Sequence, residues 1–261
     1  MIGRMWAIAL NTFREAVRIR VLYGILVLVV GANLMTLVLG QMAVNEQARV
    51  TRDIGLASVS LFGSLTAIFL GVFLLYTEVQ RRTIHAIVSK PIERWEFVVG
   101  KYLGMALVLS VLVAVFAVAM ALMLLWKGGG VTGPVVKAVV LAWFEVQVVA
   151  AVAIFFSSFS TPFLSGIFAL AVWVIGRVTP DLERAAKSAS AAIQATSKIA
   201  LQIVPDLHLY SVSGRPDEPT LSVHGDFVSW GYVATAGLHG IGWIVALLAL
   251  AAVLFHRRDF A

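Results

Sequence analysis

Few residues in this sequence have the types and spacing that chemistry requires. The chain has no cysteine, which excludes thiol chemistry, disulfides and cysteine-ligated metal sites. It contains no GxxxxGK(S/T) phosphate loop, no HExxH zinc motif and no GxSxG nucleophile elbow. The histidines are too scattered for metal-ligand spacing: His85, His208, His224, His239 and His256. His224 with Asp226 could hold a metal ion, but two solvated loop residues are the simpler interpretation. We therefore expect no catalytic residue, metal or cofactor on this chain.

Three polar side chains inside long apolar runs are the better candidates for a site. Glu145 lies near the middle of one run with Gln147 two residues later, and His239 lies in the last run. An ionisable group in hydrocarbon is costly unless it is paired or hydrated. Glu145 therefore either faces a hydrated route or a second subunit, or bonds a neighbouring helix, for which His239 is the candidate partner. In both cases it should face protein rather than lipid.

The apolar runs themselves predict the fold class. The chain is 60% hydrophobic and 13% charged, whereas soluble domains are about 45–50% apolar and about 25% charged. Six runs are long enough to cross a bilayer, which takes roughly 17–25 helical residues. They are residues 21–39, 54–76, 102–126, 135–156, 160–178 and 231–255. We expect an all-α integral membrane protein with six transmembrane helices, forming a single domain over residues 1–261.

The positive charges predict the orientation. With the N-terminus in the cytoplasm, eleven Lys and Arg fall on the inner side: Arg4, Arg14, Arg18, Arg20, Arg81, Arg82, Lys90, Arg94, Lys101, Arg257 and Arg258. The short outer loops carry four: Arg49, Arg52, Lys127 and Lys137. Positive charges concentrate in cytoplasmic loops, so both termini should be cytoplasmic. This bias explains the basic balance without nucleic-acid binding.

Two further segments complete the expected architecture. Residues 1–20 alternate apolar and basic positions at helical spacing, which predicts an amphipathic helix in the inner interface. Residues 179–230 form an external segment, alanine-rich and helical at first and a loop from Pro205 onward. It is the place for a substrate exit, a periplasmic partner or a structural cap.

The inner segment between the second and third runs is the most informative. Residues 81–89 can form about two helical turns with an apolar side, and Pro91 then stops that helix. Such a short helix can dock on a cytoplasmic protein and convert its movement into helix tilt.

This segment resembles the cytoplasmic loop of permease subunits in the ABC-2 family of ATP-binding-cassette transporters. The matching residues are Glu78, Thr83, Ile84, Ser89, Pro91, Ile92, Arg94, Phe97, Gly100 and Lys101. Arg82 departs from the pattern, because the family commonly has Gly there. The step Pro205-Asp206-Leu207 and the ending 256–260 also agree with the family. Among its members, permeases associated with multicopper-enzyme maturation are the most similar in layout.

The resemblance implies an exporter-like (type V) permease in a bacterial inner membrane. Two permease subunits, identical or related, would bind two cytoplasmic ATPases, which would hold the ATP and Mg²⁺. Residues 78–96 would be the coupling loop, and the first, second and fifth spans would line an outward route. The implied coupling residues are Glu78, Arg81, Arg82, Thr83, Ile84, His85, Ile87, Val88, Ser89, Pro91 and Arg94.

Two other functions stay open at this point. An ATP-independent carrier or channel usually has several charged residues or broken helices at mid-membrane, whereas this sequence has essentially one acid there. A membrane anchor for a periplasmic assembly is compatible with the long external segment.

Overall fold

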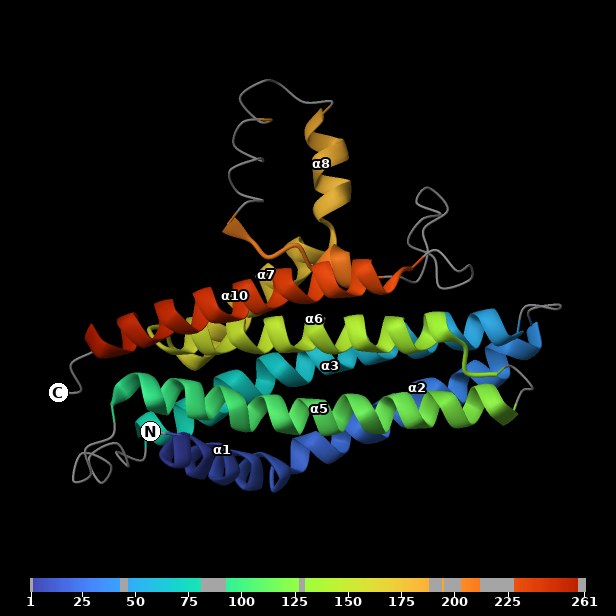
Figure 1. Ribbon diagram of the computed structural model, residues 1–261. Helices are drawn as coiled ribbons and strands as arrows, with labels where there is room; N and C mark the ends of the chain where they lie inside the picture. The colour runs from blue at the N-terminus through green and yellow to red at the C-terminus, as the bar shows by residue number, and fades with distance from the viewer. Residues whose placement is uncertain are drawn as a thin grey trace.

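The computed structural model describes residues 2–42, 47–80, 93–126, 130–187, 194, 203–211 and 228–257. Within these ranges every regular element is helical. Five long helices run along one direction and form a bundle: α2 (Arg20–Met42), α3 (Gln47–Gln80), α5 (Arg94–Trp126), α6 (Gly133–Ser157) and α10 (Trp230–Arg257). Figure 1 shows this bundle from the side. The all-α prediction is therefore confirmed.

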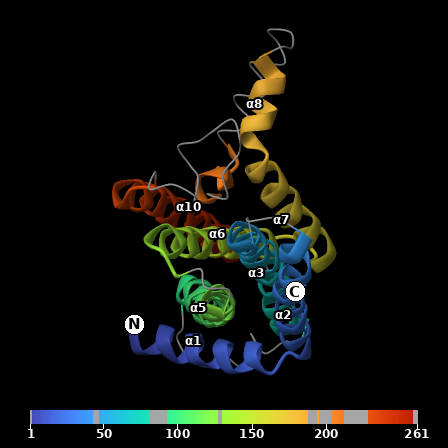
Figure 2. The same ribbon diagram turned by 90° about the vertical axis from the view of Figure 1, so that its right-hand side faces the viewer.

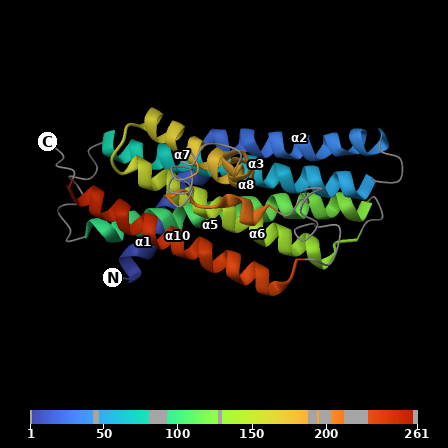
Figure 3. The same ribbon diagram turned by 90° about the horizontal axis from the view of Figure 1, so that it is seen from above.

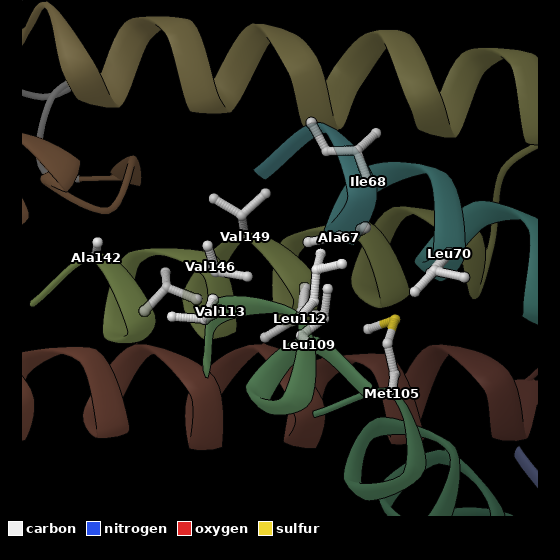
Figure 4. Packing of buried hydrophobic residues seen from close by; sticks show 14 of the residues in the cluster. Ala67, Ile68, Leu70, Met105, Leu109, Leu112, Val113, Ala142, Val146 and Val149 are labelled. Carbon is white, nitrogen blue, oxygen red and sulfur yellow. The ribbon is translucent and has the colours of Figure 1, made fainter. Parts of the chain in front are cut away.

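Helix α6 lies at the centre of the bundle and contacts α3, α5, α7 and α10. It begins after Thr132 with Pro134 in its first turn, where a missing backbone N–H costs nothing. Every residue of α6 from Glu145 to Ile154 is buried. Figure 4 shows how side chains from α3, α5 and α6 interlock in this core.

Small residues let α3 approach α6 closely. A Cβ atom built on Gly63 would lie 2.7 Å from Cγ2 of Val146, and one built on Gly71 would lie 2.6 Å from Cβ of Ala153. Both separations are far below normal van der Waals contact, so the two backbones meet where a side chain would not fit.

Helix α1 (Ile2–Val17) lies across the bundle against α5, as Figure 2 shows along the bundle's length. Its packed face consists of Ala9, Thr12 and Ala16, which are fully buried, whereas Trp6 is 55% exposed. Glycines on α5 allow this contact, because a Cβ atom on Gly104 would lie 2.6 Å from Cβ of Thr12. A helix is therefore present at residues 2–17 of the predicted 1–20, and its location in the inner interface stays a prediction.

Four described helices, or five spans if one bent pair counts as a span, are candidates for crossing a membrane. Among the described residues, α3, α5, α6 and α10 are long and apolar enough to cross a membrane. A fifth span exists if α7 (Pro162–Arg177) and α8 (Thr179–Lys187) count as one, although they meet at a bend of 67°. The predicted first span, residues 21–39, lies within α2, where the apolar helix Leu22–Gly31 is shorter than a membrane span. The six-span count stays a prediction.

Candidate functional site

Glu145 occupies the midpoint of α6, Gly133–Ser157, and its side chain is 1% exposed. Two uncharged groups donate to its carboxylate: Ser60 Oγ to Oε2 at 2.7 Å, and Trp173 Nε1 to Oε1 at 3.2 Å. Ser60 lies on α3 and Trp173 on α7. The carboxylate is therefore held by two neighbouring helices and faces protein.

Arg177, the last residue of α7, supplies the opposite charge. Its Nη1 donates to Glu145 Oε1 at 2.7 Å and also to Ser60 Oγ. The arginine side chain is 26% exposed, so one side of the guanidinium reaches out of the core. A charged pair in a low-dielectric interior is stable only when further hydrogen bonds satisfy both groups, and here Ser60 bonds to each of them.

A small cavity lies beside this ion pair. Its volume is about 20 Å³, which is enough for about one water molecule. It is lined by Leu56, Ala57, Ser60, Ala138, Ala142, Glu145, Arg177, Tyr210 and Ser211. The hydroxyl and guanidinium groups on its wall give a water molecule polar partners inside the bundle.

The segment 203–211 covers this site. It contains the short helix η1 (Leu207–Tyr210), and Ser211 Oγ lies 3.5 Å from Nη2 of Arg177. Tyr210 is nearly buried and donates through its hydroxyl to the carbonyl of Ala236 on α10 at 3.2 Å. Burial raises the pKa of this phenol above its ordinary value. The segment is thereby anchored against α10 beside the end of α7.

Asp206 caps η1 by accepting a hydrogen bond from the backbone N–H of His208 at 3.1 Å. Partial burial raises the pKa of its carboxyl, although the hydrogen bond and the nearby His208 oppose that rise. Burial is the dominant cause, so the fold favours the protonated form of this acid more than water does.

Gln147 faces the opposite side of α6. Its amide donates to the carbonyl of Ala106 and to Ser110 Oγ, both at 3.3 Å. Trp143 Nε1 donates to the same Ser110 hydroxyl at 2.8 Å. Gln147 and Glu145 are thus both buried, but they belong to separate polar clusters, one against α5 and the other against α3 and α7.

His239 does not join either cluster. It lies exposed on α10, and its Nε2 accepts a hydrogen bond from Trp243 Nε1 of the same helix at 3.1 Å. The suggested pairing of Glu145 with His239 is therefore wrong. The reason is helix orientation, since α10 presents Gly237 and Gly240 to α6 and turns His239 to its outer side.

The predicted coupling residues lie mostly outside the described residues. This applies to Arg81, Arg82, Thr83, Ile84, His85, Ile87, Val88, Ser89 and Pro91. Glu78 belongs to the last turn of α3, and Arg94 is the first residue of α5. These two helix ends lie at the same end of the bundle in Figure 1. The roles assigned to the eleven residues stay predictions.

Sequence reasoning missed the partners of Glu145. Arg177 lies at the end of the predicted fifth run, residues 160–178, and was not considered as a partner for Glu145. One signal was available: a single acid in a span implies a nearby base, and Arg177 is, with Lys137, one of two Lys or Arg residues inside the six apolar runs. Ser60 and Trp173 carry no comparable signal.

A comparison with protein families matches residues 6–260 to the family described as ABC-2 family transporter protein. No curated protein matches the chain.

Proposed function

Because the chain belongs to the ABC-2 family of transporter proteins, we propose that it is the permease subunit of an ATP-binding-cassette exporter. The family match over nearly the whole chain is the observation that carries this proposal. In this proposal, two permease copies form the membrane path in a bacterial inner membrane. Two separate ATPase subunits bind ATP and Mg²⁺ on the cytoplasmic side and drive outward movement of the cargo.

The geometry at one end of the bundle supports coupling to a cytoplasmic protein. Helix α3 ends and α5 begins there, so the segment joining them, residues 81–92, starts and finishes at that end. Helix α1 crosses α5 just beyond, where Lys101 lies 3.6 Å from Glu15 of α1 and is only 3% exposed. A force applied to the segment 81–92 would therefore reach α3 and α5 directly and α1 through its contact with α5.

The Glu145 site would provide a second link for a movement that starts at residues 81–92, because it connects α3 to α6 and α7. It joins α3, α6 and α7 through Ser60, Glu145 and Arg177. By resemblance to the family, α3 and α7 correspond to the second and fifth spans, which would line the route. The ion pair joins α6 to α7, and Ser60 of α3 is hydrogen-bonded to both of its members, so α3 and α7 would move together rather than separately.

Affinity purification from native membranes in mild detergent tests this proposal. We expect a phosphate-loop ATPase to co-purify in about equal amount and to hydrolyse ATP. Replacing Ile84 and Ile87 with Asp should abolish that association, because charges would disrupt an apolar docking face. The matched control replaces the same residues with Val and should retain the ATPase.

If the folded wild-type chain yields no ATPase, the proposal is wrong. Recovery of a periplasmic assembly protein instead would then favour the membrane-anchor function, and recovery of the chain alone would favour an ATP-independent carrier. If the Asp variant still holds the ATPase, the coupling segment has been misassigned, although the permease function would stand.

A further inference from the structure

Outside its contact with α5, helix α1 presents two flanks of different character. A helix turns by about 100° per residue, so residues three and four apart share a side. The apolar flank holds Trp6, Leu10, Phe13 and Val17, of which Trp6 is 55% and Leu10 37% exposed. The basic flank holds four exposed residues: Arg4, Asn11, Arg14 and Arg18. Arg18 follows the end of α1, but its backbone N–H bonds to the carbonyl of Glu15 at 3.1 Å and continues the last turn.

The acid of α1 does not neutralise this basic flank. Glu15 is the only acidic residue between Ile2 and Val17, and its carboxylate lies 3.6 Å from Nζ of the buried Lys101 on α5. Its negative charge thereby compensates Lys101, and the exposed flank keeps the positive charge of its arginines. The guanidinium group carries forked N–H donors that fit the oxygens of a phosphate. The flank is therefore suited to an anion that contains phosphate.

Close packing fixes the direction in which both flanks point. A Cβ atom built on Gly100 of α5 would lie 2.9 Å from Cβ of Ile8, and one built on Gly104 would overlap the carbonyl oxygen of Ala9. Side chains do not fit at such separations, so α1 lies directly on the backbone of α5 at two successive turns. The arginines are thus held by a fixed helix and not by a loop, which lowers the entropy cost of binding a ligand.

Two observations favour the headgroup region of a bilayer as the surroundings of α1. Figures 2 and 3 show that it crosses the direction of the long helices near the end of the bundle where α5 begins. Trp6 of α1 and Trp95 at the start of α5 are exposed there, and tryptophan concentrates at the boundary between hydrocarbon and water. An amphipathic helix lies at this boundary with its apolar flank toward the acyl chains and its basic flank toward the headgroups.

We propose that α1 binds an anionic phospholipid, with Arg14 and Arg18 on the phosphate of its headgroup and Leu10 beside its acyl chains. Arg14 and Arg18 are four residues apart, so their Cβ atoms are about 5–6 Å apart and both guanidinium groups can reach one phosphate. A zwitterionic lipid carries an ammonium group close to its phosphate, which offsets the attraction to arginine. The net negative charge of the lipid therefore decides which lipid binds.

Fluorescence quenching by brominated lipids tests this site on the purified chain. The chain has no cysteine, so Leu10→Cys carries a single bimane label one turn from Arg14. Val245→Cys on α10, a position that is 62% exposed, provides the reference site. Each labelled chain is reconstituted into vesicles of phosphatidylcholine and phosphatidylglycerol in which only one of the two lipids carries bromine on its acyl chains. The ratio of the two quenching values gives the relative affinity of the lipids at each label.

At Leu10→Cys we expect phosphatidylglycerol to be preferred by about fivefold or more, because each basic residue near a membrane surface contributes about that factor toward anionic lipid. At Val245→Cys the two lipids should quench almost equally. Replacing Arg14 and Arg18 with Gln should abolish the preference, whereas replacing both with Lys should preserve most of it. Arg184→Gln on α8 is the matched control and should leave the preference unchanged.

Equal quenching by both lipids at Leu10→Cys would overturn the proposal, as would a preference that persists in the double Gln variant. A preference of the same size at Val245→Cys would also overturn it, because the enrichment would then be general and not confined to α1. Failure of both lipids to quench the Leu10→Cys label would show that protein covers this flank, and an acidic surface of a partner would then be its occupant. The vesicles contain no ATPase, so the result is independent of the proposed coupling.

Discussion

At the scale of single residues, the contact between Glu145 and Arg177 is the most consequential feature of this chain. The carboxylate is almost fully buried, whereas a quarter of the arginine side chain is exposed. Removing a charge from water is costly, and the cost is recovered only when the partner charge and further donors are present. Ser60 and Trp173 provide those donors from two different helices. The pair should therefore be sensitive to the loss of either member.

We predict that Glu145→Gln and Arg177→Met each lower the free energy of unfolding by roughly 1–3 kcal/mol. This is less than the roughly 3–5 kcal/mol for breaking a fully buried pair, because Arg177 keeps some contact with water. The double variant should lose clearly less than the sum, since neither charge is then left unpaired. Thermal unfolding in detergent measures this coupling.

Arg184→Met provides the matched control for this cycle. Arg184 pairs with Asp181 at 3.7 Å, but both side chains are about half exposed. An exposed ion pair contributes about 0–1 kcal/mol, so this variant should unfold nearly as the wild type does. Strictly additive losses for Glu145→Gln and Arg177→Met would show that the two residues do not act as a pair.

At the scale of elements, the contact between α3 and α6 depends on glycines spaced along α3. Gly63 and Gly71 both face α6, and the fully buried Ala67 lies between them, four residues from each. This spacing puts the three residues on one face of the helix, where small side chains let the backbones come close. Close packing over this length holds α3 in a fixed position against the central helix.

We predict that Gly71→Ala destabilises the protein by about 1–3 kcal/mol, because the added methyl group would overlap Ala153 and force the helices apart. The control is Gly24→Ala on α2, where a Cβ atom would meet nothing within 4 Å. It should be neutral, or stabilising by up to about 1 kcal/mol through helix propensity. The melting temperatures of the two variants in the same detergent test this prediction. Equal values would contradict the close contact between Gly71 and Ala153.

At the scale of the whole molecule, the helix ends show that the start of α1 and the end of α10 share one end of the bundle, whereas α6 starts at the other (Figure 1). That the first of these ends is cytoplasmic stays a prediction from the charges.

We predict that Gly3→Cys reacts with a membrane-impermeant maleimide only after permeabilisation, whereas Val131→Cys reacts from outside in intact spheroplasts. Val131 is exposed between α5 and α6, so its accessibility does not depend on local unfolding. Reaction of both cysteines from the same side would refute the predicted topology. Reaction in the reversed pattern would refute the orientation while preserving the bundle.

The sequence by itself determined the fold class, the helix positions and the family. Helix length and hydrophobicity are local properties, so each of the six apolar runs could be located without knowledge of its neighbours. The runs at 102–126 and 135–156, for example, lie within α5 and α6. The residues that resemble the family pattern, 78–101, are likewise one continuous segment, so the resemblance could be recognised without the tertiary structure. The closer likeness to permeases of multicopper-enzyme maturation stays a prediction.

Only the tertiary structure decided which residues form the site. Glu145 and Arg177 are 32 positions apart, and their contact depends on where α7 ends, how it packs on α6 and how sharply it bends into α8. The candidate partner, His239, does not bond Glu145 for a similar reason. Gly237 and Gly240 pack against α6 and set the rotation of α10 about its axis, which turns His239 away. Pairing between helices is fixed by such packing contacts, which hydropathy and spacing along one chain do not encode.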